Sequence, residues 1–415
     1  MSISTPPKED TGTTPAISGR AQSVPSSPIR KLADLAISAK ERGVKVYHLN
    51  IGQPDVATPP EFFQGIREFS EKVVEYGHSK GLKVLLEAWA RYYAQKGLDV
   101  EPNQIQVTTG GSEAVAFSFM LTCDTGDNVV VSEPFYTNYG SIATALDIKL
   151  KPVQANPDLG YCLPAREEIE NAIDDRTRAL MICSPNNPTG TVLRRDEVAT
   201  VVQIADERKL FVISDEVYRE FCYEGDHTSI WQFAQIGDRA ILLDSISKRF
   251  SACGARIGAL VCRNTQVMDA ALRLGQARLS TPTVEQVAAA RLMDLGEDYY
   301  AQLADEYKSR RDLMFERLEQ MPGVFCRKPS GAFYMMATLP VDDSDRFCRW
   351  MLTDFSHEGQ TVMMAPGDGF YSTPGSGRQE ARLAYVLKTD ELSKAMDTLA
   401  VGLEAYPGRQ DTGKP

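Results

Sequence analysis

The segment DSISKRFSACGARIG, residues 244–258, decides how the rest of the chain is interpreted. It follows the apolar run 240–243, which predicts a short buried strand, so Ser245 and Lys248 should emerge at the carboxyl end of that strand. Open α/β sheets bind their ligands at this edge. The segment therefore predicts a ligand site.

Lys248 and Arg256 suit a Schiff-base amine with an anion-binding group beside it. The amine must lose its proton to attack a carbonyl, and a nearby cation or partial burial lowers its pKa. Arg256 can hold a phosphate through two hydrogen bonds, and Ser245 can donate another. The alternative is a solvated Lys-Arg pair after a strand, which the short motif alone would favour.

Length and composition set broad limits on the class of protein. A chain of 415 residues is too long for one ordinary core, so two domains are expected. Apolar residues at 43% and charged residues at 24% are typical of a soluble globular protein. The formal net charge of −11 argues against nucleic acid and anionic membranes as partners.

Cysteine and histidine usage indicates a cytoplasmic protein without a metal centre. The eight cysteines are scattered singly, with no C-x-x-C pair and no secretory signal, which favours reduced thiols. None of the four histidines is paired at metal-ligand spacing, so no metal is expected. No apolar run is long enough to span a membrane.

Alternating strand and helix patterns between residues 105 and 245 predict right-handed crossovers and a mainly parallel sheet. Short strands and helices beyond residue 323 indicate a second, smaller α+β domain. Ser27 and Pro28 predict the start of a helix that ends at Gly43. The expected organisation is a disordered tail 1–27, an N-terminal segment 28–58 packing with the small domain, a large domain 59–300, a small domain 301–408 and a tail 409–415.

Further polar residues follow the other predicted strands. Gly111 and Ser112 lie where a strand gives way to a helix, and free N–H groups together with the helix dipole would bind an anion there. Tyr136 could stack over a planar ring, although a core tyrosine is the commoner outcome. Asp215 and Tyr218 lie one helical turn apart and could face one ligand, or could be a capping aspartate and a core tyrosine.

The chain order of these segments resembles the class I aminotransferases of pyridoxal-phosphate fold type I. The likeness rests on SPNNPTG (184–190), SDEVY (214–218) and SISKRF with ARIG (245–258), and it covers about residues 28–406. It implies an α/β fold, with a large domain around a mainly parallel seven-stranded sheet and a smaller α+β domain. The implied cofactor is pyridoxal 5′-phosphate (PLP).

The resemblance also implies a role for each cofactor-binding residue. Lys248 would bond the cofactor as a Schiff base and move the substrate proton, while Asp215 would keep the pyridine nitrogen protonated. Asn187 and Tyr218 would hydrogen-bond the ring oxygen, and Tyr136 would stack on the ring. The phosphate would be held by Gly111, Ser112, Ser245 and Arg256.

Substrate binding and assembly follow from the same likeness. Arg382 matches the family's arginine for the substrate α-carboxylate, with Gly52 and Asn187 bordering that carboxylate. Tyr76 matches a tyrosine that reaches the cofactor phosphate of the neighbouring subunit, which implies a homodimer with shared active sites.

The leading hypothesis is a transaminase acting on an L-amino acid and a 2-oxo acid, with aspartate and 2-oxoglutarate favoured. A substrate with a second carboxylate needs a second cation. Arg278 of the neighbouring subunit is the candidate, although the family's usual position falls nearer Gln276, two residues earlier. Arg278 could instead be a solvated helix-end or interface residue, in which case an enzyme for aromatic or other neutral amino acids is expected. A PLP-dependent lyase and a non-catalytic cofactor sensor are the competing hypotheses.

Overall fold

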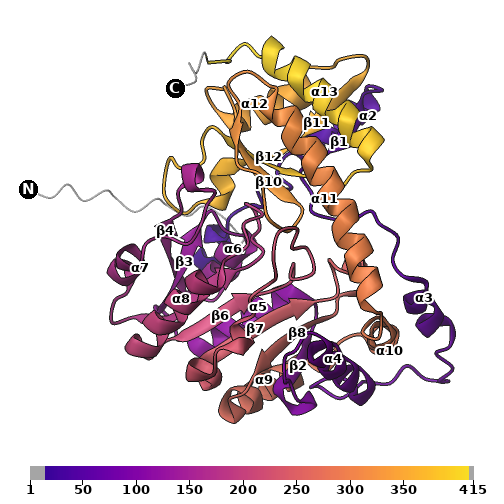
Figure 1. The fold of residues 1–415 in the computed structure, drawn as a ribbon, viewed down its shortest axis with the longest axis vertical. Helices are drawn as coiled ribbons and strands as arrows, with labels where there is room; N and C mark the ends of the chain where they lie inside the picture. The colour runs from indigo at the N-terminus through magenta and orange to yellow at the C-terminus, as the bar shows by residue number, and fades with distance from the viewer. Residues whose placement is uncertain (1–14, 411–415) are drawn as a thin grey trace, which may run out of the picture.

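The structure, a computed structural model, describes residues 15–410 (Figure 1). A seven-stranded sheet and its helices form one part of the molecule, and two smaller sheets with their own helices form the other. The long helix α11 runs from the first part into the second. The expected tail segments 1–14 and 411–415 lie outside the described residues.

The large sheet has the strand order β2-β8-β7-β6-β5-β3-β4. Only β8 runs in the opposite direction to the other six strands, so the mainly parallel seven-stranded sheet predicted from the sequence is confirmed. Its strands are β2 (Ile105–Thr108), β3 (Asn128–Glu133), β4 (Lys149–Gln154), β5 (Thr177–Cys183), β6 (Phe211–Asp215), β7 (Ala240–Ser245) and β8 (Gly258–Cys262).

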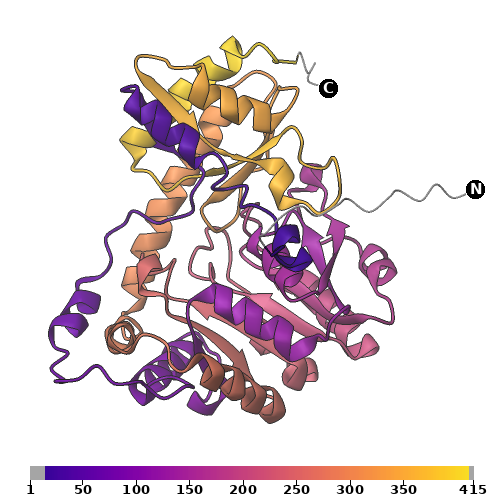
Figure 2. The same cartoon turned by 180° about the vertical axis from the view of Figure 1, so that it is seen from behind.

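Helices cover both faces of this sheet. Because successive side chains of a strand point to opposite sides, neighbouring residues of one strand pack against different helices. Val212 and Leu242 pack in a cluster with α4 and α8, whereas Ile213 and Leu243 pack in another with α5, α6 and α9. Figure 2 shows α5 lying along one face. The helices of this part are α3 (Pro60–Arg67), α4 (Lys83–Gln95), α5 (Gly111–Thr122), α6 (Asn138–Ala145), α7 (Arg166–Ala172), α8 (Arg195–Arg208), α9 (Thr265–Arg278) and α10 (Thr283–Leu292).

The second part has its own hydrophobic core. Its four-stranded sheet has the order β12-β13-β10-β9, and β1 pairs in parallel with β11 beside it. The strands are β1 (Lys45–His48), β9 (Phe325–Cys326), β10 (Tyr334–Thr338), β11 (Gln360–Met363), β12 (Ala365–Pro366) and β13 (Glu380–Ala384). The helices are α2 (Ala33–Glu41), α11 (Glu297–Glu319), α12 (Ser344–Thr353) and α13 (Thr389–Ala405).

The N-terminal segment differs from its sequence prediction in two ways. Part of the expected tail forms the short helix α1 (Gly19–Ser23), because the Ser18 hydroxyl accepts a hydrogen bond from the N–H of Ala21 at 3.2 Å. The helix expected from Pro28 begins only at Ala33, and residues 28–32 form turns in which the N–H groups of Arg30 and Lys31 bond to the Ser27 carbonyl. These turns bring the chain to the junction of the two parts.

Six short 3-10 helices lie in the connections of the described chain: η1 (Pro102–Gln104), η2 (Pro157–Leu159), η3 (Ile230–Gln232), η4 (Ala234–Arg239), η5 (Cys253–Ala255) and η6 (Gly367–Phe370). Across residues 15–410, no helix is both long and apolar enough to cross a bilayer. The same range holds no group of three or more His, Cys, Asp or Glu side chains that could bind a metal ion.

Candidate active site

A cavity of about 640 Å³ lies between the two parts of the molecule, because its lining includes Asp215 and Ser245 at the carboxyl ends of β6 and β7 and Arg382 of β13. Eleven of the thirteen site residues predicted from the sequence line it, drawn from both parts of the chain. They are Gly52, Gly111, Ser112, Tyr136, Asn187, Asp215, Tyr218, Ser245, Lys248, Arg256 and Arg382. A larger surface hollow of about 760 Å³, around Cys162 and Phe325, contains none of them.

One end of the cavity is built to bind an anion. Helix α5 begins at Gly111, so the positive end of its dipole faces the cavity. Gly110 adopts φ of 75°, and a Cβ there would lie 2.5 Å from Nη2 of Arg256. The Arg256 guanidinium donates to the carbonyls of Cys253 and Thr109 at 3.1 and 3.3 Å. Glycine at position 110 therefore lets the arginine lie against the helix start.

Lys248 lies deep in the cavity. Its Nζ donates to the Gly52 carbonyl at 2.7 Å. Burial lowers the pKa of Lys248, and the positive charges of Arg382 and Arg256 lower it further, against opposing contributions from Cys253 and Asp215. A lowered pKa favours the neutral amine, which is the form that attacks a carbonyl.

Asp215 ends β6 with its carboxylate facing the cavity. Burial raises the pKa of this carboxyl from its ordinary value of 3.8 to about 6, although hydrogen bonds from Tyr139 and from the Val217 N–H oppose the rise. The Tyr139 hydroxyl donates to Oδ2 at 2.5 Å, and the Val217 N–H donates to Oδ1 at 3.2 Å. These two donors fix the orientation of the carboxylate.

Arg382 is 1% exposed and is held by residues far away in the sequence. Its Nη1 donates to Oδ1 of Asn187 at 2.8 Å, and its Nη2 donates to the carbonyl of Asn50 at 2.5 Å. The ring of Tyr334 packs against it, with the ring centroid 4.4 Å from the guanidinium carbon. Nε of Arg382 is buried without a hydrogen-bond partner among the described residues. The cation is fixed in place and still has a donor available.

Three residues of this site carried no signal in the sequence pattern. Tyr139, Asn50 and Tyr334 acquire their roles only through contacts with distant segments, such as the 2.8 Å hydrogen bond between the hydroxyls of Tyr334 and Tyr218. A Cβ at Gly52 would lie 1.6 Å from the Tyr334 hydroxyl, so only glycine fits there.

Tyr76 and Arg278 do not line the cavity of their own chain. Both line a separate open groove, and the Tyr76 side chain is 80% exposed. Arg278 is directed inward: its Nη2 donates to the carbonyls of Ser79 and Val107 at 3.3 and 3.2 Å, and its Nε lies 3.5 Å from Oε1 of Glu113.

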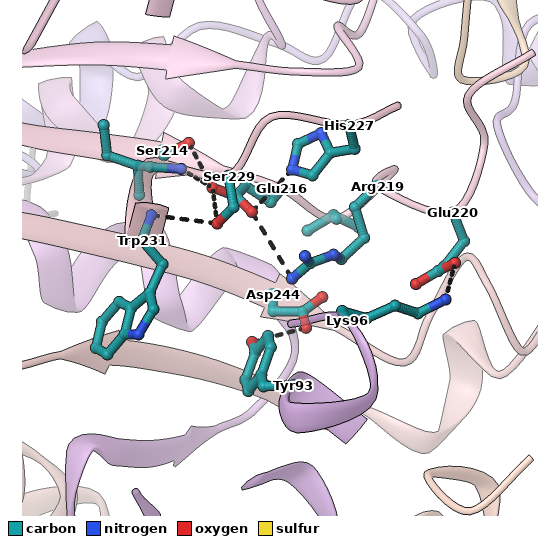
Figure 3. Close-up of polar contacts among 12 residues, drawn as sticks. Tyr93, Lys96, Ser214, Glu216, Arg219, Glu220, His227, Ser229, Trp231 and Asp244 are labelled. Carbon is teal, nitrogen blue, oxygen red and sulfur yellow. Dashed lines mark hydrogen bonds and ion pairs between the residues drawn. The ribbon is translucent and has the colours of Figure 1, made fainter. Parts of the chain in front are cut away.

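Buried polar contacts surround the carboxylates of Glu216 and Asp244 (Figure 3). Glu216, next to Asp215, accepts hydrogen bonds from the Ser229 hydroxyl at 3.1 Å and the Ile230 N–H at 2.9 Å. Asp244, next to Ser245, accepts hydrogen bonds from the buried indole, phenol and guanidinium groups of Trp89, Tyr93 and Arg249. Glu216 and Asp244 thus each adjoin, in the chain, a residue that lines the cavity.

The donor set of the cavity fits PLP. The helix start at Gly111, with Arg256 and Ser245, suits a phosphate; the buried Asp215 carboxylate suits a protonated ring nitrogen; and the buried Lys248 amine suits an aldehyde. The unpartnered Nε of Arg382 suits a further carboxylate. A phosphorylated aldehyde and an amino acid together present each of these groups.

Comparisons with known proteins point the same way. A family described as aminotransferase class I and II matches residues 44–399. The aspartate aminotransferase of Thermotoga maritima is 31% identical over 386 residues, covering 92% of this chain and 98% of that protein. The aspartate/prephenate aminotransferase of Thermus thermophilus is 28% identical over 391 residues, with 92% and 98% covered.

Among solved structures, an alanine aminotransferase from Pyrococcus furiosus superimposes with a TM-score of 0.86 at 28% identity. The match covers 94% of this chain and all of that one. Proteins of this architecture therefore include some named for an acidic substrate and some named for a neutral one.

Proposed function

This chain belongs to the aminotransferase class I and II family, a family of PLP-dependent transaminases, and from that premise we propose its substrates and the roles of its residues. It moves an amino group between a dicarboxylic L-amino acid, aspartate first, and a 2-oxo acid such as 2-oxoglutarate. The observation that carries the assignment is the convergence of the Lys248 amine, the Asp215 carboxylate and the Arg382 guanidinium on one cavity.

Lys248 is the proposed covalent anchor of the cofactor and the group that carries the substrate α-proton. The chemistry that PLP supplies when bound is an electron sink for the pair left at the substrate α-carbon. Asp215 keeps a proton on the ring nitrogen, and the hydrogen bond from Tyr139 holds the carboxylate in position for that role. Tyr218 and Asn187 are proposed to bind the ring oxygen.

Arg256, Ser245, Gly111 and Ser112 are the proposed phosphate ligands. Tyr136 is proposed to cover the ring face. Arg382 is proposed to bind the substrate α-carboxylate through the donors that Asn187 and Asn50 leave unused, because a planar guanidinium can pair with a carboxylate through two parallel hydrogen bonds. Gly52 keeps that space open.

A homodimer with shared active sites is the proposed assembly. The side chains of Val73, Val74 and Tyr76 are 65%, 64% and 80% exposed, and a run of exposed apolar residues is typical of a surface that another subunit covers. Tyr76 would then reach the cofactor phosphate of the partner subunit. Arg278, which lines the same groove, would approach the partner's substrate side chain if it exchanged Glu113 for that ligand.

A neutral substrate is the second candidate. It is favoured by the ion pair between Arg278 and Glu113, which already balances that cation, and by the likeness to an alanine aminotransferase. The two candidates differ in whether the substrate side chain needs a cation.

The test is a substrate panel. Purified protein with PLP is mixed with 2-oxoglutarate and each of aspartate, alanine and phenylalanine, and glutamate formation is measured. Aspartate should give the highest kcat/KM, whereas a preference for alanine or phenylalanine supports the second candidate. Arg278→Ala tests the candidate cation: a selective loss of kcat/KM for aspartate would place Arg278 at the substrate side chain, and equal effects on aspartate and phenylalanine would remove Arg278 from the site.

A further inference from the structure

The cavity lining contains more positive charge than the proposed ligands account for. The charged side chains among the described lining residues are Arg30, Lys248, Arg256 and Arg382, with Asp215 as the only carboxylate. Under the proposed function, Lys248 and Arg256 bind the cofactor and Arg382 binds the substrate α-carboxylate. Of these described side chains, one cation, Arg30, is left without an anion.

Arg30 lies on the open side of the cavity, because it lines the cavity and its side chain is also solvent-exposed. No Asp or Glu oxygen among the described residues lies within 4.0 Å of its side-chain nitrogens, and no hydrogen bond of its guanidinium is found there either. Its positive charge is close enough to the Tyr136 hydroxyl to lower the pKa of that group, although burial raises it overall. Within residues 15–410, Arg30 is thus a free cation beside the residue proposed to cover the cofactor ring.

The backbone that carries Arg30 is firmly held. The next residue, Lys31, pairs with Asp345 at 2.7 Å. The preceding carbonyl, of Ile29, accepts a hydrogen bond at 2.8 Å from the side chain of Asn50. Asn50 also accepts the hydrogen bond from Arg382 through its carbonyl, so one residue links the segments that carry Arg30 and Arg382.

Arg278 differs from Arg30 in its exposure, in its ion pairing and in the surface that it lines. Its side chain is 17% exposed and lines no part of this cavity in its own chain, and its Nε lies 3.5 Å from Oε1 of Glu113. Taking Arg278 to a substrate would break that ion pair, whereas Arg30 has no ion pair to break in the described part of the chain. The free-energy cost of freeing the cation is therefore lower for Arg30, which favours Arg30 as the cation for a substrate side chain.

We propose that Arg30 binds the side-chain carboxylate of a dicarboxylic substrate, in the same subunit as the Arg382 that binds its α-carboxylate. The inference rests on the proposed function, since it concerns the substrate of that same site. It makes Arg30 a specificity-determining residue that acts in place of Arg278.

The test compares kcat/KM of the PLP-loaded enzyme and its variants for aspartate, alanine and O-phosphoserine. Arg30→Gln should lower the value for aspartate about tenfold or more while that for alanine changes little, because only aspartate loses a charge partner. Arg30→Lys should retain part of the aspartate activity, since the charge remains while the two-pronged geometry is lost. Arg20→Gln is the matched control: Arg20 is an exposed arginine of α1 that does not line the cavity, and its loss should affect no substrate.

The outcomes separate this inference from the proposed function. If wild-type enzyme transaminates none of the three substrates, the proposed function fails. If it uses aspartate but Arg30→Gln reduces aspartate and alanine equally, or reduces neither, the assignment of Arg30 is wrong. If Arg30→Gln lowers kcat/KM for O-phosphoserine and leaves that for aspartate unchanged, Arg30 binds a substrate phosphate, and the proposal that it binds a carboxylate is wrong. A selective loss on aspartate from Arg278→Gln, with none from Arg30→Gln, would return the role to Arg278.

Discussion

Lys248 and Asp215 illustrate how burial prepares individual side chains for chemistry. Burial disfavours the charged form of each group, so it lowers the pKa of the lysine and raises the pKa of the aspartic acid. In the cofactor-free protein the protonation equilibrium of each group is therefore shifted toward its uncharged form. A cofactor with an aldehyde and a basic ring nitrogen would make use of both.

Lys248→Ala should abolish transamination and leave weak PLP binding. The covalent anchor and the proton carrier are lost together, whereas Arg256 and the start of α5 remain. Turnover is measured with the substrate panel, and cofactor retention by absorbance after dialysis. Normal turnover in this variant would contradict the assignment of Lys248.

Asp215 should make the stability of the cofactor-free protein depend on pH. Its pKa is about 6 in the folded chain, above the ordinary 3.8, so its contribution is fully present below about 3.8 and is lost as the pH rises through about 6. Asp215→Asn cannot lose a proton and should be more stable than wild type at pH 7 by about 3 kcal/mol, at about 1.4 kcal/mol per pKa unit. The advantage should shrink toward pH 4.

The comparison is made by urea unfolding of both cofactor-free proteins across that pH range. A constant difference between them would show that Asp215 does not titrate as described. With PLP bound, the same variant should lose more than tenfold of kcat, because the ring nitrogen loses its charged partner.

At the scale of elements, the ends of β6 and β7 are fixed by carboxylates that point away from the cavity. Asp244 joins β7 to α4 through Trp89 and Tyr93, and it pairs with Arg249 at 2.6 Å between groups that are both fully buried. Glu216 does the same for the chain after β6 through Ser229 and Ile230 (Figure 3). Residues facing the cavity are thus held by their neighbours in the sequence.

Asp244→Asn should destabilise the fold by about 3 kcal/mol or more, because it leaves the Arg249 guanidinium buried without a counter-charge. Asp294→Asn is the matched control: its ion pair with Arg91 at 3.0 Å is half exposed, and its removal should cost less than about 1 kcal/mol. Both values come from denaturant unfolding monitored by circular dichroism. Equal costs for the two substitutions would mean that the buried pair is not a structural support.

At the scale of the whole molecule, the cavity exists because two separately packed parts meet. Asp215 ends β6 and Lys248 follows β7 of the large sheet, whereas Arg382 comes from β13 in the second part. Asn50 and Asn187 connect them by bonding the same guanidinium. The exposed Tyr76 lies outside this arrangement in a single chain, so any role for it needs a second subunit.

Subunit mixing tests the shared site. Chains carrying Lys248→Ala and chains carrying Tyr76→Ala, each of low activity alone, should regain part of the activity when mixed, because one site of the heterodimer is intact. Mixing Lys248→Ala with Asp215→Ala chains is the control, since those two residues belong to the same subunit's site and no intact site forms. No recovery in the first mixture, once heterodimers are detected by mass, would place Tyr76 in its own subunit's structure only.

The sequence by itself determined the sheet and most of the site. A strand followed by glycine, hydroxyl or charged residues sets local geometry over a few positions, which is why Gly111, Asp215, Ser245 and Lys248 could be placed at one edge of a parallel sheet. The motif order also pointed to the family, and the comparisons confirmed it.

Only the tertiary structure decided which other groups join that edge. Tyr139, Tyr334 and Asn50 bond to site residues between 76 and 332 positions away, and no local pattern encodes such pairs. The charge of Arg278 is balanced by Glu113, which lies in another helix. The charge of Arg30 has no such partner among the residues that the structure describes. Whether a cation is free or neutralised is a property of its surroundings in space, so spacing along the chain could not reveal it.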